Sequence, residues 1–278
     1  MPVITISRGS YSRGKEVAEK VAARLGFECI SRDILLEASE EFNIPEIRLV
    51  RALHDAPSVL DRFTHGKERY ISYIRKALLK RVQKDNVVYH GLAGHYFLQH
   101  IPHVFKIRVI SDMAERVKEE IKRENITGEK ALYILKKDDD ERRRWGLQLY
   151  GIDTWDSQLY DLVLHVKTIT VDDAVDIICR MAQAPIFQAT PESRRILDNL
   201  LLAAEIKAAV VELEPMLKVT AEDGVVHISG IDTVRKIKPQ VLAEIKAVAA
   251  VREGVRKVIL DGDLTDSEHH AVNPFHNL

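Results

Sequence analysis

The feature that most restricts the fold lies at the start of the chain, where an apolar run, a glycine-containing loop and an amphipathic segment follow one another within residues 3–26. The run Val3–Ile6 contains β-branched residues and no charge, which is typical of a strand buried on both faces of a parallel sheet. Residues 17–25 repeat apolar side chains at helical spacing, and Gly26 is suited to end that helix. A strand, a loop and a helix in this order direct backbone amides at one small volume, where an anion is favoured.

The loop itself matches a phosphate-binding pattern in which Gly9 and Gly14 are separated by four residues and Lys15 follows. Glu16 stands where this pattern has a serine or threonine, whose hydroxyl normally binds magnesium. A strand-to-helix turn that uses glycine only for its backbone freedom is the alternative. We expect a phosphate site, and the nucleotide-binding residues predicted are Gly9, Ser10, Tyr11, Ser12, Arg13, Gly14, Lys15 and Glu16.

Length, composition and charge restrict the classes of protein to which the chain can belong. The 278 residues suffice for one large or two ordinary domains, and 46% hydrophobic with 30% charged residues is ordinary for a globular protein. The net charge of −1 argues against a general nucleic-acid binder, which usually has a basic excess. No stretch approaches the ~20 apolar residues of a membrane span, and the N-terminus lacks the features of a signal peptide. We therefore expect a cytoplasmic protein.

Further apolar runs alternate with helical patterns and predict four more strands, at residues 27–30, 87–89, 103–110 and 162–166. This alternation favours an α/β fold with a parallel sheet and right-handed crossovers. Arg32 and Asp33 follow the first of these runs, at the expected start of a helix. Ligands of such folds bind at the carboxyl ends of the strands, so these positions are candidate substrate contacts.

Four histidines occur close together, at positions 90, 95, 100 and 103, and suggest a metal site. Their spacing does not place two of them on one helical face beside a carboxylate, as such sites require. The sequence therefore leaves the metal ligands unassigned.

A change in composition near residues 183–192 predicts a linker between two domains. Beyond it, residues 193–262 read as helix, strand, strand, helix, strand, with Asp223-Gly224 as the turn of a hairpin. We expect a first domain over residues 1–182, this small α+β domain over 193–262, and a disordered tail over 263–278.

The first domain resembles the cytidylate kinase-like branch of the nucleoside monophosphate kinases. The residues that carry the resemblance are Ile4–Arg8 with the glycine loop, Arg32-Asp33, Gly91, the run Asp140-x-Arg142-Arg143, and Tyr160–Leu164. The resemblance implies a P-loop NTPase-type parallel sheet flanked by helices. It also implies ATP and Mg²⁺ as cofactors and transfer of the γ-phosphoryl group to a pyrimidine nucleoside monophosphate.

The resemblance further implies roles for individual residues. Lys15, together with the glycines of the loop, would hold the donor phosphates, and Arg142 and Arg143 would be catalytic arginines on a mobile lid. Arg32, Asp33 and Gly91 would contact the acceptor. Lysine and arginine in these roles are physically reasonable, because phosphoryl transfer depends on positioning and on neutralising charge.

A second interpretation stays open from the sequence alone. Glu16, the side chains at Tyr11 to Arg13 and Leu92 after Gly91 depart from the pattern of the family. They favour a degenerate kinase fold that binds nucleotide as a regulatory module coupled to the second domain.

The second domain, residues 193–262, resembles a BON domain. The resemblance rests on Val219, on the hairpin Gly224–Gly230 and on Gly254-Val255 before the last strand. It implies ligand binding or association, so an oligomer or ligand contact through this domain is expected. A small accessory domain without a ligand is the alternative.

Overall fold

The computed structural model describes residues 2–9, 13–31, 33–43, 66–91, 93–230 and 237–261. The chain forms two compact units, Met1–Leu197 and Asp198–Leu278. The division falls inside one helix, α10 (Pro191–Val210). In the predicted linker, Pro185–Phe187 form a short 3₁₀ helix, and Phe187 stacks on Phe105 in the core of the first unit. The predicted tail lies outside the described residues.

The first unit is built on a five-stranded sheet in the order β2-β3-β1-β4-β5, in which every pair of neighbours is parallel. The predicted α/β fold with a parallel sheet is therefore confirmed. The strands are β1 (Val3–Arg8), β2 (Glu28–Ile30), β3 (Val87–Tyr89), β4 (Val104–Ile110) and β5 (Leu162–His165). The central strand β1 is the predicted N-terminal one, and its first residues are fully buried as expected for such a strand.

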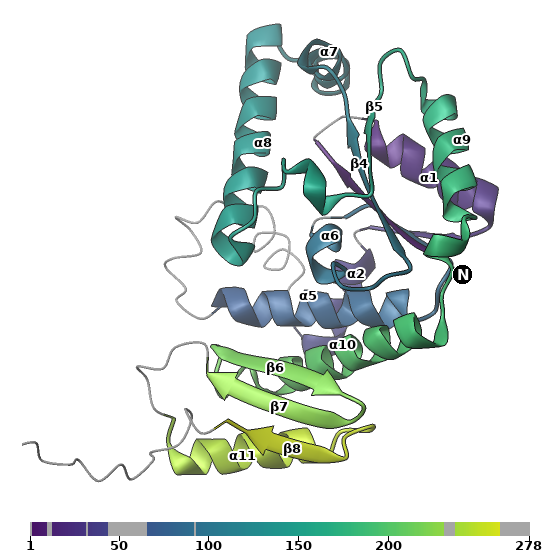
Figure 1. Ribbon diagram of the computed structural model, residues 1–278. Coiled ribbons are helices and arrows are strands. Elements are labelled where there is room, and N and C mark those ends of the chain that lie inside the picture. The colour runs from purple at the N-terminus through teal and green to yellow at the C-terminus, as the bar shows by residue number, and fades with distance from the viewer. Residues whose placement is uncertain are drawn as a thin grey trace, which may run out of the picture. The chain divides into compact units, whose positions relative to one another are not determined.

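Helices connect the strands and cover the sheet (Figure 1). They are α1 (Gly14–Leu25), α2 (Asp33–Phe42), α5 (Gly66–Val82), α6 (Gly94–Phe97), α7 (Met113–Glu124), α8 (Gly128–Tyr150) and α9 (Val171–Ala182). Successive side chains of a strand point to opposite faces of a sheet. Ile4 and Ile6 of β1 join the core that α1 and α9 cover, whereas Thr5 lies against Gly94 of α6. The helices α1 and α9 therefore lie on one face of the sheet, and α6 lies on the other.

The second unit contains the end of α10, β6 (Leu217–Glu222), β7 (Val225–Gly230), α11 (Pro239–Ala250) and β8 (Lys257–Leu260). The sheet order is β6-β7-β8, with an antiparallel hairpin followed by a parallel pair. Asp223 and Gly224 both have positive φ, 45° and 80°, as the predicted tight hairpin turn requires. The predicted order of elements is thus present, while the resemblance to a BON domain stays a prediction. Among the described residues, no helix is long and apolar enough to span a membrane.

Candidate nucleotide-binding site

The centre of the site is the connection between β1 and α1. β1 ends at Arg8 and α1 begins at Gly14, whereas Ser10, Tyr11 and Ser12 lie outside the described residues. Arg13, just before the helix, has a left-handed backbone with φ of 61°. A Cβ atom on Gly14 would stand 2.6 Å from Cβ of Arg8, so a side chain there would force the strand end and the helix start apart. Glycine at this position therefore keeps the N-terminus of α1 against the carboxyl end of β1.

The first turn of α1 carries the two predicted site residues with charged side chains on this helix, Lys15 and Glu16. Nζ of Lys15 lies 3.6 Å from Oε1 of Glu19, and the Lys15 side chain is 63% exposed. An exposed pair of this kind contributes little energy, so the Lys15 ammonium can leave it for a phosphate at small cost. Glu16 is held between two cations: its carboxylate is 3.4 Å from Nζ of Lys20 and 3.8 Å from Nη1 of Arg13.

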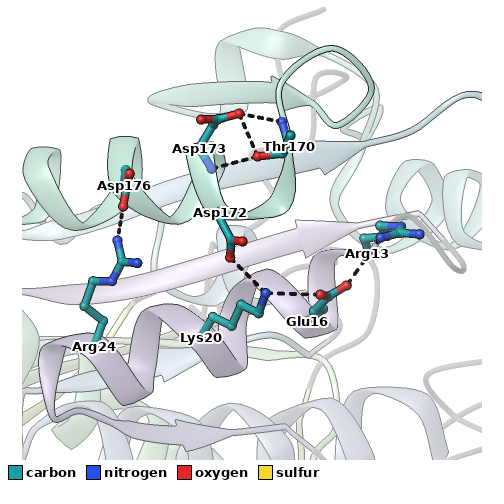
Figure 2. A network of polar contacts seen from close by, with 8 residues as sticks. All are labelled: Arg13, Glu16, Lys20, Arg24, Thr170, Asp172, Asp173 and Asp176. Carbon is teal, nitrogen blue, oxygen red and sulfur yellow. Dashed lines mark hydrogen bonds and ion pairs between the residues drawn. The ribbon is translucent and has the colours of Figure 1, made fainter.

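Glu16 belongs to a chain of exposed ion pairs that joins α1 to α9, shown in Figure 2. Lys20 donates to Asp172 at 2.9 Å, and Arg24 pairs with Asp176 one turn further along both helices. The hydrogen bonds to Asp172 and Asp176 raise the pKa of Lys20 and of Arg24. We call the residues Arg13, Glu16, Lys20, Arg24, Asp172 and Asp176 the ladder. The ladder lies along α1 and α9, and through it the Glu16 carboxylate is paired with Lys20 and Arg13.

On the other flank, α7 and α8 reach the end of β1. Arg116 of α7 is buried and donates two hydrogen bonds to Asp139 of α8, at 2.7 and 2.9 Å. The Arg116 guanidinium lies 3.5 Å from the position that a Cβ atom on Gly9 would take. Arg142, one turn beyond Asp139, donates from Nη1 to the carbonyl of Arg8 at 3.0 Å. We call Arg116, Asp139 and Arg142 the clasp, because they fix two cationic groups at the entry to the glycine loop.

The two arginines of α8 that were predicted to act in catalysis contact different parts of the protein. Arg142 belongs to the clasp, whereas Arg143 bonds to Asp153 in the loop after α8, at 2.6 and 2.9 Å. The Arg143 guanidinium also lies 4.9 Å from the ring centroid of Trp155. The bond with Asp153 raises the pKa of Arg143 and lowers that of Asp153. Of these two arginines, Arg142 therefore contacts the Arg8 carbonyl, at the described end of β1.

The predicted lid run lies within α8, which is one continuous helix of 23 residues. The helix begins after Thr127, whose side chain accepts a bond from the amide of Lys130, and it ends before Gly151 in a left-handed conformation. No proline interrupts it, and Lys137 and Glu141 pair at helical spacing. These local signals favour helix over loop across the whole run.

The predicted acceptor contacts are only partly described. Asp33 begins α2, but nothing is described of its side chain, and Arg32 and Leu92 lie outside the described residues. Gly91 follows β3, and a Cβ atom there would stand 2.1 Å from the Tyr89 hydroxyl oxygen. Close packing thus requires glycine at position 91 whether or not a substrate contacts it. The proposed contacts of Arg32, Asp33 and Gly91 with the acceptor stay a prediction.

A buried polar group lies near the same edge of the sheet, around Tyr160. The Tyr160 hydroxyl lies 3.2 Å from Oγ of Ser7 and donates to the carbonyl of Thr154 at 3.0 Å. The ring of His95 lies 5.2 Å from the ring of Tyr160, and its Nε2 has no hydrogen-bond partner among the described residues. Burial, aided by the charge of Arg108, lowers the pKa of His95 to about 3. His95 is thus a neutral core residue at ordinary pH.

Magnesium fits this site only as a companion of the nucleotide. Across the described parts of the chain, no three His, Cys, Asp or Glu side chains cluster in a way that could hold a metal ion. Glu16, at the position of the usual magnesium hydroxyl, is instead paired with Lys20 and Arg13. Mg²⁺ commonly retains several waters and binds through substrate phosphates with only one or two carboxylates. The half-exposed Glu16 is the one predicted loop residue that can supply such an oxygen.

Sequence reasoning missed Arg116 and Asp139. Arg116 occupies the buried stripe of α7, three residues after Met113, where an apolar residue is expected. A charged residue on such a stripe could have indicated a buried ion pair, because buried charges require partners. Asp139 gave no signal of its own within a run of three aspartates.

The sequence of the first unit is similar to proteins of a known family. Residues 3–168 match the cytidylate kinase-like family. The cytidylate kinase of Sulfolobus acidocaldarius is 24% identical over 177 residues, which cover 63% of this chain and 91% of that protein. The cytidylate kinase of Ignicoccus hospitalis is 25% identical over 183 residues, covering 65% of this chain and 99% of that protein.

A solved structure is similar in fold. The crystal structure of an uncharacterized protein from Eubacterium ventriosum aligns with a TM-score of 0.51 and 18% identity, covering 66% of this chain and 99% of the other. This likeness concerns the fold alone. The family match spans more than half of the residues, and on that match the chain belongs to the cytidylate kinase-like family.

Proposed function

We propose that the protein is a nucleoside monophosphate kinase that transfers the γ-phosphoryl group of ATP to a pyrimidine nucleotide. The observation that carries the proposal is the convergence at the carboxyl end of β1. Lys15 lies in the first turn of α1 there, Arg142 of α8 bonds to the Arg8 carbonyl, and the Arg116 guanidinium adjoins Gly9. Three cations from three helices at one glycine loop suit a polyphosphate better than any uncharged ligand.

The chain supplies positioning and charge in this reaction. The N-terminus of α1 and Lys15 hold the donor phosphates, since helix amides and a lysine ammonium favour anions. Arg142 exchanges its bond with the Arg8 carbonyl for the transferred group, where the negative charge spreads in the transition state. Mg²⁺, when bound with ATP, neutralises part of the phosphate charge. The choice of a pyrimidine acceptor rests on the family relationship.

The second unit is proposed to act in association or ligand binding, as the resemblance to a BON domain implies. It forms its own core, in which Ile206, Leu217, Val226, Ile228 and Ile245 are buried. A separate core allows this unit to fold independently of the kinase-like unit. Comparison of the full chain with a chain that ends near residue 197, by sedimentation, tests whether it drives association.

The test of the kinase proposal is an assay of ATP consumption with Mg²⁺ across CMP, UMP, dCMP, AMP and GMP. We expect phosphorylation of a pyrimidine monophosphate, and Lys15→Ala to weaken ATP binding by about tenfold or more, since a bond to a charged group is lost. Lys118→Ala is the matched control, because Lys118 is also an exposed helix lysine paired with a nearby glutamate, Glu115. Equal ATP affinity of wild type and Lys15→Ala, measured by titration calorimetry, would remove the phosphate role of the loop.

A further inference from the structure

His90 is a buried histidine that has no role in the site or the reaction described above. It directly follows β3, and only 6% of the residue is exposed. Its Nδ1 is buried and has no hydrogen-bond partner among the described residues. Buried polar atoms are almost always hydrogen-bonded, so a buried ring nitrogen without a partner needs an explanation.

The position of His90 is fixed by backbone pairing. β3 lies between β2 and β1, and the His90 amide donates to the carbonyl of Ile30, the last residue of β2, at 3.1 Å. The helix α1 packs against β3. His90 therefore stands at the carboxyl edge of the sheet, with β1, which ends at Arg8, on one side and β2, which ends at Ile30, on the other.

Charges of the loop act on the imidazole. Burial is the main reason that the pKa of His90 is lowered, and the charges of Arg8 and Lys15 lower it further, whereas Glu19 and a hydrogen bond with the backbone of His90 itself raise it. Arg8 ends β1, and Lys15 and Glu19 belong to the first turns of α1, so the charged groups that affect His90 come from the phosphate-binding loop and its helix. The imidazole is thus neutral at pH 7, with one of its nitrogens able to donate.

We propose that His90 is a substrate contact in which Nδ1–H donates a hydrogen bond to the transferred γ-phosphoryl group, between donor and acceptor. This inference rests on the proposed kinase function. A neutral donor suits the position, because Lys15, Arg142 and Arg116 already supply positive charge around the loop. The bound γ-phosphate provides the partner that buried Nδ1 lacks.

The test compares two substitutions of His90. In His90→Phe the ring and its packing are retained and both nitrogens are lost, whereas in His90→Asn an amide N–H stands close to the position of Nδ1. Binding of the β,γ-imido analogue of ATP and of ADP, each with Mg²⁺, is measured for both variants by calorimetry. His100→Gln is the control, because His100 is an exposed histidine of the same segment.

We expect His90→Phe to weaken binding of the ATP analogue by about tenfold to a hundredfold, the usual loss for a bond to a charged group, and to leave ADP affinity nearly unchanged. His90→Asn should retain most of the affinity for the analogue. Melting temperatures report whether each variant is folded.

Two different results would overturn the proposal, and they are distinguishable. If Lys15→Ala weakens binding of the analogue and His90→Phe does not, or if His90→Phe affects the analogue and ADP equally, His90 is not a γ-phosphate contact and the kinase proposal stands. If wild type binds neither nucleotide, both proposals fall together.

Discussion

The two flanks of the glycine loop use the same kinds of charged residue in different environments. On the α7/α8 side, the side chains of Arg116 and Asp139 are 8% and 14% exposed. On the α1/α9 side, those of Lys20 and Asp172 are 44% and 74% exposed. Water screens an exposed pair and takes over its bonds when it breaks, whereas a buried charge that loses its partner stays desolvated. The buried pair of the clasp should therefore contribute to stability, and the exposed ion pairs of the ladder should contribute little to it.

The largest effect is expected on turnover, from loss of the α8 arginines. If Arg142 engages the transferred group only in the transition state, its removal lowers turnover and leaves ATP affinity nearly intact. We expect Arg142→Ala/Arg143→Ala to lose roughly a thousandfold in kcat, the lower end of what arginine fingers contribute. Turnover is measured on the best monophosphate acceptor, and ATP affinity by calorimetry.

The single variants separate the two arginines. Arg143 bonds to Asp153 and lies over Trp155, away from the loop, so Arg143→Ala should cost much less than Arg142→Ala. Equal losses in the two single variants would contradict the assignment of Arg142 as the arginine of the loop. Full activity in the double variant would remove both from catalysis.

The next largest effect is expected on stability, from breaking the buried pair of the clasp. Asp139→Ala leaves the guanidinium of Arg116 buried without its two bonds, which costs about 3 kcal/mol of unfolding free energy in such cases. The double variant Arg116→Met/Asp139→Leu removes both charges and should recover most of that loss, because apolar replacements of a buried pair are often neutral. Denaturant unfolding of the three proteins measures both values. A double variant as unstable as Asp139→Ala would show that the pair, and not the stranded charge, sets the cost.

Much of the first unit was predictable from local patterns, because strands such as β1 and β3 are buried on both faces and helix ends carry standard signals. The strand Val3–Ile6 and the left-handed Gly26 after α1 both appear as expected. In these places the neighbouring residues along the chain decide the conformation.

The clasp was not predictable in the same way. Arg116, Asp139 and Arg8 are brought together by the packing of α7 on α8 and by the position of β1 in the sheet, and no local pattern encodes these contacts. The mobile lid carrying Arg142 and Arg143 was implied by the family resemblance alone; both arginines lie on the continuous helix α8, and their role on a lid stays a prediction. The glycine loop was recognised from its spacing, but Ser10–Ser12 lie outside the described residues, so its sequence pattern is still the main support for its role.

A moderate effect is expected from buried His95 as the pH falls. Its folded-state pKa of about 3 lies below the ordinary value of 6.5, so between these values the unfolded chain takes up a proton that the folded chain refuses. Stability is therefore retained above pH 6.5 and lost below it, by about 1.4 kcal/mol per pH unit from this group. His95→Phe keeps a ring between Tyr96 and Tyr160 and should remove this part of the acid sensitivity. Denaturant unfolding at pH 7 and pH 5 measures it, with exposed His100→Gln as the control; the same pH slope in His95→Phe and wild type would refute the assignment.

The smallest effect is expected on the ladder, and it is the sharpest test of the comparison between the flanks. Asp172→Asn/Asp176→Asn removes both anions of α9 that pair with α1 and leaves the glycine loop untouched. Exposed pairs gain little in water and are screened over a few ångströms in molar salt. The melting temperature should fall slightly at low salt, and the difference from wild type should vanish at about 1 M salt. Asp139→Asn, an equally small chemical change, should destabilise the protein at both salt concentrations, because solvent ions do not reach the buried Arg116. The α9 variant could instead lose as much stability as Asp139→Asn and keep that loss at high salt. Burial would then not distinguish the two flanks, and the ion pairs between α1 and α9 would be needed to stabilise the start of α1.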